Sequence, residues 1–163
     1  AAALRYPPRG VRGVVGTSRA NRFGTQRVSL EAANEGVALI VQLESPRALD
    51  ALEDIAAVDG VDALFVGPAD LSAGMGLGGD PTHPDVMKAL VRAAARAQAL
   101  GKPIGTLAGT PEVAAQVRAA GYDFVGIGTD LGWLVRSAQA SLAALRSGDA
   151  PLVHTLSGGT HSY

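Results

Sequence analysis

The feature that most constrains the fold of this chain is a series of short apolar runs, each followed by a segment with helical periodicity. The clearest run covers residues 63–66, where ALFV leads directly into a Gly-Pro break. An unbroken apolar run is typical of a strand that is buried on both faces of a parallel sheet. Similar runs cover residues 38–44, 103–108 and 123–129. The chain is therefore predicted to contain four strand–helix units.

Start signals mark several of the helices between these runs. Ser45, His83 and Thr110 each stand directly before a proline, which is typical of an N-cap followed by the first helical position. His83 is therefore interpreted as a helix-start residue rather than a catalyst. After the Gly-Pro break we expect a loop that continues into the glycine-rich residues 74–79. The predicted helices cover residues 29–34, 46–56, 84–101, 111–121 and 132–146.

Alternating strand–helix units with right-handed connections make either a doubly wound sheet or part of an eight-unit barrel. Gly105, Gly126 and Gly128 favour the barrel, because its inner layers taper and need small residues. We expect an α/β chain of (β/α)8 TIM-barrel type that holds half of the units. Its first and last strands would present open edges.

Two of the predicted strands end in acidic side chains. Glu44 closes one strand with Gln42 on the same face, and Asp70 follows the Gly-Pro break after the next. The segment between them has about the length of one strand–helix–strand unit of roughly 30 residues, so the two strand ends should lie side by side. Two carboxylates beside an amide favour a hard divalent cation, magnesium or manganese. The alternative is that Asp70 and Glu44 only cap helices and bind no metal.

Composition excludes several classes of function. The 163 residues are 47% hydrophobic, which allows one domain with a real core, and a net charge of -1 gives no electrostatic footprint for nucleic acid. The absence of cysteine excludes disulfides, thiolate metal sites and a cysteine nucleophile. No apolar run approaches the roughly 20 residues of a membrane span. We expect a cytoplasmic protein without a nucleic-acid or membrane partner.

The two ends of the chain carry fewer signals. Arg9 and Arg12 lie in a segment rich in Pro and Gly, where they either hold an anionic substrate or are solvated loop charges. Residues 147–163 lack periodicity and are predicted to be a tail, either disordered or packed on a neighbouring subunit. His154 and His161 in this tail have no ligand spacing. The chain begins with alanines rather than methionine, and we expect it to be a piece of something longer.

A set of motifs gives the chain a specific resemblance. RYPPRGVRG, VQLES, LFVGPADLSAGMG, GDPTHP, GKPIGTLAG and GYDFVGIGTDLGWL occur in this order over residues 4–146. In this order and spacing they resemble the class II pyruvate aldolases, and more narrowly the 4-hydroxy-2-oxoheptanedioate aldolase and 2-keto-3-deoxy-L-rhamnonate aldolase family. The resemblance implies a TIM barrel whose last four strand–helix units, the carboxyl-terminal half, are residues 1–146, followed by the tail.

The resemblance also implies a site. Glu44 of VQLES and Asp70 of GPADLS would bind a divalent metal (Mg, Mn or Co). Gln42 would line the same pocket, the backbone amides of Ala69 and Asp70 would hold the pyruvate carboxylate, and Arg12 would border the pocket. The family's general-base histidine and keto-binding arginine belong to the missing amino-terminal half, so no catalytic residue is assigned here.

The implied reaction is the reversible cleavage of a 4-hydroxy-2-keto acid to pyruvate and an aldehyde. It leaves an enolate, whose developing charge a chelated metal stabilises. The competing Schiff-base chemistry needs a placed lysine. The only lysines, Lys88 and Lys102, are predicted to lie in a helix and at the opposite end of the barrel.

Two alternatives remain beside this aldolase. One is an acyl-CoA lyase of the malyl or citramalyl type, with similar strand-end carboxylates. The other is a non-catalytic half-barrel that only associates with another chain. The resemblance further implies a homo-oligomer, commonly a hexamer that exchanges carboxyl-terminal helices.

Overall fold

The computed structural model describes residues 1–147, so His154, His161 and all of the predicted tail except Ser147 lie outside the described part. Residues 1–127 form one compact unit, and a second unit begins at Gly128. The strands are β1 (Ile40–Leu43), β2 (Ala63–Val66), β3 (Ile104–Ala108) and β4 (Phe124–Ile127). The helices are α1 (Leu30–Glu35), α2 (Pro46–Asp50), α3 (Leu52–Ala56), α4 (Pro68–Gly74), α5 (Pro84–Ala99), α6 (Pro111–Ala119) and α7 (Asp130–Ser147), with short 3-10 helices at Ala2–Leu4 and Arg19–Gly24.

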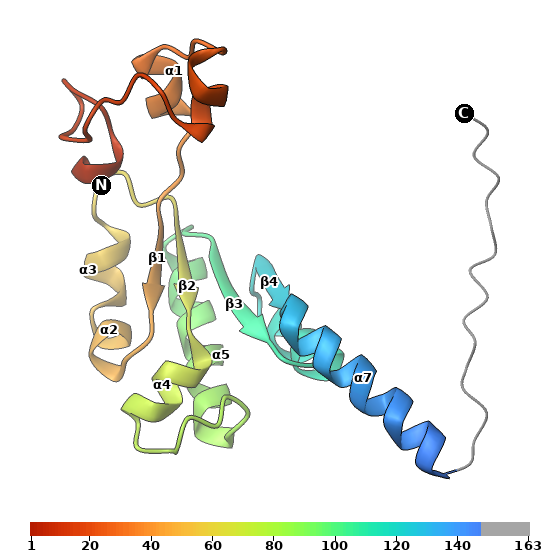
Figure 1. The fold of residues 1–163 in the computed structure, drawn as a ribbon. Helices are drawn as coiled ribbons and strands as arrows, with labels where there is room; N and C mark the ends of the chain where they lie inside the picture. Colours follow the sequence, from red (N-terminus) through yellow and green to blue (C-terminus); the bar gives the residue numbers. More distant parts are fainter. Residues whose placement is uncertain (148–163) are drawn as a thin grey trace. The chain divides into compact units, whose positions relative to one another are not determined.

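The four strands form one parallel sheet in the order β1-β2-β3-β4 (Figure 1). Each strand pairs with the next one along the chain, as consecutive right-handed units require. In this register Gln42 lies beside Phe65, Phe65 beside Gly105, and Gly105 beside Phe124. The predicted succession of four strand–helix units is therefore confirmed.

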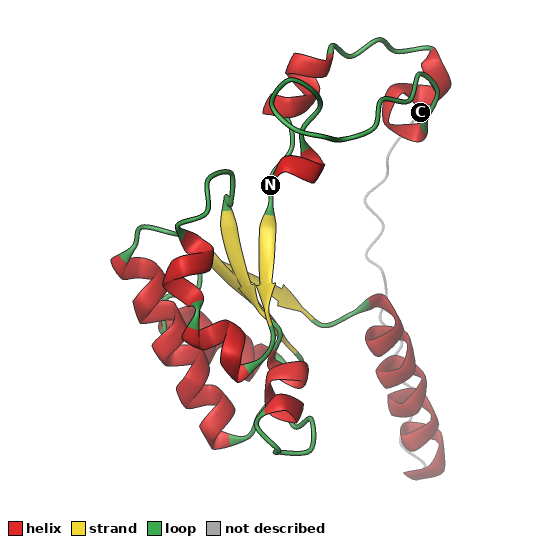
Figure 2. Cartoon of the chain, turned by 90° about the vertical axis from the view of Figure 1, so that its left-hand side faces the viewer, coloured by secondary structure: helices red, strands yellow, loops and turns green. Residues whose placement is uncertain are grey.

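The helices α2, α3, α5 and α6 lie on one face of the sheet (Figure 2), where they cover the core, whereas α1 and the 3-10 helices lie beyond the amino ends of the strands. Every second strand residue points into this core, including Leu43, Leu64 and Ile104, all fully buried. The opposite face carries no helix of this unit, and on it Ile40 and Leu107 are 50% and 40% exposed. In a closed barrel this second face would form the interior.

Gly105 provides the room that this inner face needs. A Cβ atom at Gly105 would lie only 2.1 Å from Cε2 of Phe124, so the Phe124 ring occupies the space of the absent side chain. The rings of Phe65 and Phe124 are 6.2 Å apart between centroids. This packing gives a direct reason for one of the small residues that favoured a barrel.

The predicted helix starts are confirmed by their caps. The Ser45 Oγ accepts a hydrogen bond from the Ala48 N–H, and Thr110 caps α6 in the same way. Nδ1 of His83 accepts a hydrogen bond from the Asp85 N–H, which supports the interpretation of His83 as a helix-start residue.

Two local predictions were wrong. Residues 46–56 form two helices rather than one, because the chain leaves helical geometry at Ala51 (φ −89°, ψ 15°). The guanidinium group of Arg96 on α5 donates hydrogen bonds to the carbonyl groups of Leu49 and Asp50 beside this break. The expected loop after the Gly-Pro break is instead the helix α4, which Pro68 begins at its first position.

Two aspartates tie the starts of neighbouring strands together. Oδ2 of Asp62, just before β2, accepts a hydrogen bond of 2.6 Å from the N–H of Leu39, just before β1. Asp123 accepts one of 2.8 Å from the N–H of Ile104 in β3. Each aspartate also donates its own N–H to the carbonyl of the same partner. The strand pairs β1–β2 and β3–β4 are thus each joined near their amino ends by the same pair of hydrogen bonds to an aspartate.

No helix within residues 1–147 is both long enough and apolar enough to cross a lipid bilayer.

We predict that Asp123→Ala lowers the free energy of unfolding by about 1 kcal/mol, because the N–H of Ile104 loses its acceptor. Urea unfolding followed by circular dichroism measures this. The control is Asp54→Ala, which removes an acidic side chain on α3 for which no hydrogen bond is found; it should change stability by less than about 0.5 kcal/mol. Equal effects of the two substitutions would contradict the role of Asp123.

Candidate functional site

The predicted metal ligands lie at the carboxyl edge of β1 and β2. Leu43 pairs with Val66 at the ends of the two strands, so Glu44 and Gly67 follow at the same level. The N–H of Gly67 donates a 3.1 Å hydrogen bond to the Leu43 carbonyl. The buried hydroxyl group of Thr106 donates to the Val66 carbonyl and fixes the end of β2. These two hydrogen bonds fix the carboxyl ends of β1 and β2 in place.

The side chains of Gln42 and Glu44 converge over Gly67. A Cβ atom at Gly67 would lie 3.0 Å from Nε2 of Gln42 and 3.2 Å from Oε2 of Glu44. Both side chains therefore come this close only because residue 67 has no side chain. This convergence places an amide and a carboxylate at the start of α4, as the strand-end pattern predicted.

Asp70 lies in the first turn of α4, which begins directly after Gly67. The N-cap is Gly67, so the alternative that Asp70 itself is the N-cap was wrong. Gly67 has no side chain to accept hydrogen bonds, and the first intrahelical N–H of α4 is that of Leu71. The amides of Ala69 and Asp70 are therefore available to an external acceptor.

A hollow of about 210 Å³ opens at this edge and brings most of the predicted residues together. Its size suits a small organic acid rather than a cofactor. Glu44 is not among the lining residues, and its side chain lies beside Gly67, which is one of them. The lining residues are Gln42, Phe65, Gly67, Pro68, Ala69, Asp70, Pro81, Leu107 and Gly109.

The sequence analysis did not single out the apolar walls of this hollow, Phe65 and Leu107. The signal was available, because Phe65 pairs with Gln42 in the register and so points to the same face of the sheet. Leu107 shares that face on β3, two residues after Gly105.

The residues present fit a cation that keeps part of its water shell. Three exposed side chains are available as ligands: Glu44, Asp70 and Gln42. Their carboxylate and amide oxygens are the type of ligand that magnesium and manganese prefer. Within residues 1–147 no group of three or more His, Cys, Asp or Glu side chains forms a metal-binding cluster. A cation at this edge would therefore depend on two carboxylates and on water.

The structure does not bring the predicted arginines into the hollow. The Arg12 guanidinium lies 4.6 Å from the centre of the Tyr6 ring, and Arg9 pairs with Glu35. The buried side chain of Asn34 holds this segment, since it accepts from the Tyr6 N–H and donates to the Tyr6 carbonyl. Arg12 and Arg9 thus belong to the amino-terminal segment and not to the lining.

The two lysines are also remote from the lining. Lys88 pairs with Asp85 on α5 at 2.8 Å. Lys102 donates to the Val61 carbonyl, near the amino end of β2, as its predicted place at the opposite end of the strands requires. Neither amine is placed to form a Schiff base in the hollow.

We predict that Gly67→Ala weakens Mn²⁺ binding by about 10-fold, because the new methyl group must displace Gln42 or Glu44. Titration followed by electron paramagnetic resonance measures free Mn²⁺. The control is Gly13→Ala, where a Cβ atom would meet nothing within 4 Å and which does not line the hollow. If Gly67→Ala binds Mn²⁺ as tightly as the unmodified chain, the absence of a side chain at residue 67 is not needed for metal binding.

Comparisons with known proteins agree with this geometry. Residues 1–137 match the family model described as HpcH/HpaI aldolase/citrate lyase. The chain is 43% identical over 149 residues to 2-dehydro-3,6-dideoxy-6-sulfogluconate aldolase from Pseudomonas putida, covering 91% of this chain and 58% of the relative. It is 46% identical over 142 residues to 5-keto-4-deoxy-D-glucarate aldolase from Shigella dysenteriae, covering 87% and 55%.

The fold agrees as well. A crystal structure of an HpcH/HpaI aldolase/citrate lyase family protein from Burkholderia cenocepacia matches with a TM-score of 0.79 and 46% identity, covering 88% of this chain and 57% of that one. The chain thus spans somewhat more than half the length of the relatives that it matches. The predicted TIM-barrel type and the resemblance to the pyruvate aldolases are confirmed. Through the match over residues 1–137, this chain belongs to the HpcH/HpaI aldolase/citrate lyase family.

Proposed function

We propose that this chain is the carboxyl-terminal part of a metal-dependent aldolase that reversibly cleaves a 4-hydroxy-2-keto acid to pyruvate and an aldehyde. The observation that carries the proposal is the convergence of Gln42 and Glu44 over Gly67, beside Asp70. The relatives named as aldolases support the reaction class.

Glu44 and Asp70 would hold the divalent metal, Mg, Mn or Co, through their carboxylate oxygens. When bound there, the cation supplies electrostatic stabilisation for the negative charge that develops on the keto oxygen during carbon–carbon cleavage. The two exposed carboxylates leave coordination positions open for water and substrate.

The other lining residues would bind and orient the keto acid. The N–H groups of Ala69 and Asp70 would donate to its carboxylate, and the Gln42 amide would donate to a second oxygen. Phe65 and Leu107 would exclude water from the carbon skeleton. Arg12 stays a predicted substrate contact that this geometry does not support.

The described residues supply no general base for proton transfer at this site. No histidine lines the hollow among residues 1–147, and a general base must lie within hydrogen-bond reach of the proton that it removes. The proposal therefore assigns metal and pyruvate binding to this chain and leaves acid–base catalysis to the part of the barrel that it lacks.

We predict that Glu44→Gln and Asp70→Asn each abolish Mn²⁺ binding by the purified chain, because each removes one of only two charged ligands. Isothermal titration calorimetry measures binding. The control Glu31→Gln changes an exposed acidic residue on α1, far from the hollow in sequence, and should bind like the unmodified chain. Undiminished binding by either ligand variant would remove that residue from the metal site.

The acyl-CoA lyase is the second candidate, favoured by the family's description as aldolase and citrate lyase. Cleavage assays with Mg²⁺, Mn²⁺ or Co²⁺ would compare a panel of 4-hydroxy-2-keto acids with malyl- and citramalyl-CoA, after joining the chain to the amino-terminal portion of an aldolase relative. Preference for the CoA thioesters would replace the aldolase proposal. A chain that binds no metal would instead support the non-catalytic half-barrel.

The proposal includes a homo-oligomer, a hexamer by the family resemblance, and α7 supports this interface. None of its described residues is buried, although it carries many large apolar side chains. A patch of this kind on one helix is typical of a protein interface. The exposed apolar residues are Leu131, Trp133, Leu134, Val135, Leu142 and Leu145. The cytoplasmic location remains a prediction.

We predict that the double substitution Leu134→Glu and Leu142→Glu lowers the oligomer mass measured by sedimentation velocity, because it puts charges into the apolar face of α7. The control Gln139→Glu adds a charge to the same helix at an already polar position and should leave the mass unchanged. If the double variant sediments like the unmodified chain, α7 is not the interface.

A further inference from the structure

We infer that Arg96 is a positioning residue for Glu44, acting through the helix α2. This inference rests on the proposed metal site. Arg96 lies on α5, on the helix-covered side of the sheet, and it does not touch the hollow at the carboxyl edge. Its effect on that edge would pass through the backbone that directly follows Glu44.

Arg96 makes the main polar contacts that hold the end of α2. Its Nη1 donates a 2.7 Å hydrogen bond to the Leu49 carbonyl, and its Nη2 donates one of 3.3 Å to the Asp50 carbonyl. Its Nε and Nη2 also bind the carboxylate of Glu53 on α3. Hydrogen bonds from Arg96 lower the pKa of Glu53 to about 2, so this pair stays charged at neutral pH. One guanidinium therefore joins α2, α3 and α5.

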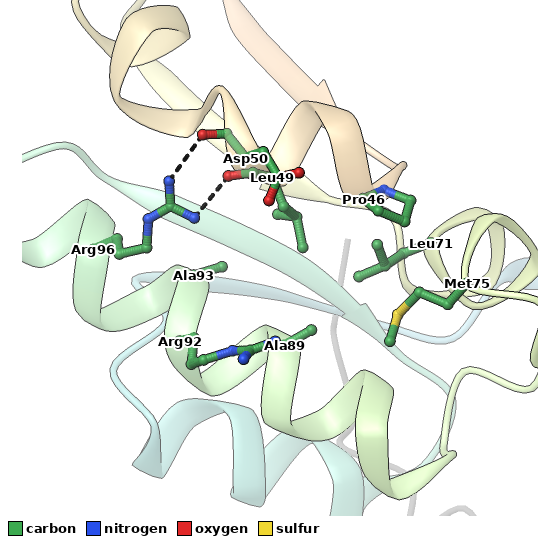
Figure 3. A pocket seen from close by; sticks show the side chains of 9 residues that line it. All are labelled: Pro46, Leu49, Asp50, Leu71, Met75, Ala89, Arg92, Ala93 and Arg96. Atoms are coloured by element: carbon green, nitrogen blue, oxygen red, sulfur yellow. Dashed lines mark hydrogen bonds between the residues drawn. The ribbon is translucent and has the colours of Figure 1, made fainter.

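A second hollow lies beside the guanidinium of Arg96. Figure 3 shows this hollow of about 300 Å³, where the side chains of Leu49 on α2 and of Leu71 and Met75 on α4 line a common space. Arg96 lies at this hollow, and its hydrogen bonds to the carbonyl groups of Leu49 and Asp50 tie the end of α2 to α5 there. The other residues that line it are Pro46, Asp50, Ala89, Arg92, Ala93 and Arg96.

The opposite end of α2 lies close to α4 at Gly74. A Cβ atom at Gly74 would lie 3.0 Å from Cδ of Pro46, the first residue of α2. Ser45, which caps α2, directly follows Glu44. The helix therefore lies between the Arg96 guanidinium at its end and Gly74 at its start, and Glu44 directly precedes its cap.

Asp70 lies on α4, which receives no hydrogen bond from Arg96 among the described residues and has core contacts of its own. Its helix α4 inserts the fully buried residues Leu71 and Ser72 into the core. Of the two elements next to the carboxylates, Arg96 therefore bonds directly to α2, which follows Glu44, and not to α4, which carries Asp70. Loss of the guanidinium contacts would shift Glu44 relative to Asp70, and metal affinity depends on this relative placement.

The test compares Mn²⁺ binding with thermal stability in the purified chain. Arg96→Lys keeps the charge but cannot bond both carbonyl groups and Glu53 at once. We expect it to weaken Mn²⁺ binding about 10-fold at a temperature well below its melting transition. Glu53→Gln, a milder change that leaves the bonds of Arg96 to the carbonyls, should give a smaller loss in the same direction. Glu53→Gln also tests the positioning role if Arg96→Lys does not fold.

A matched control separates positioning from general stability. Tyr122→Phe removes a buried hydrogen bond to the Leu90 carbonyl, also on α5, without touching α2. It should lower the melting temperature but leave Mn²⁺ affinity unchanged. Equal Mn²⁺ affinity in Arg96→Lys and the unmodified chain would overturn the positioning role alone. Loss of affinity in Tyr122→Phe as large as in Arg96→Lys would also overturn it. Absence of Mn²⁺ binding by the unmodified chain would overturn the proposed metal site as well.

Discussion

The close approach at Gly67 is the constraint on which the rest of the site depends. Gly67 ends β2, caps α4 and, because it has no side chain, leaves space for Gln42 and Glu44. Its N–H is bonded to the carbonyl of Leu43, so the ends of the two strands are fixed together. The positions of the candidate ligands therefore follow from the pairing of two parallel strands rather than from a flexible loop.

The strands and most helix starts were predictable because local information determines them. An apolar run such as residues 63–66, short and closed by a Gly-Pro break, is typical of a strand in a covered sheet, and a capping side chain acts within three residues of the helix that it begins. Strand-end reasoning likewise placed Glu44 near Gln42. The family could be identified from the sequence for a different reason. The resemblance depends on the residues of whole motifs and their order, and not on the structure that each residue favours.

The remaining features depend on contacts that are distant in the sequence. Helical periodicity continues through Ala51, but the helix breaks there beside bonds from Arg96, which lies 46 and 47 positions after the two carbonyls that it binds. Arg12 is placed by a segment that the buried Asn34 holds, a contact that spans 28 positions. No local pattern encodes either arrangement, because both arise only when separate elements pack together.

Binding and proton transfer are physically separable in this protein. The candidate ligands and all walls of the carboxyl-edge hollow lie between Gln42 and Gly109, within the first compact unit. Under the proposed function, cation affinity depends on Glu44 and Asp70 of this unit, whereas proton transfer needs a base within about 3 Å of the substrate. The sheet face that would surround such a base is partly exposed at Ile40 and Leu107. Under the proposed function, metal affinity therefore reports on the half of the barrel described here independently of turnover.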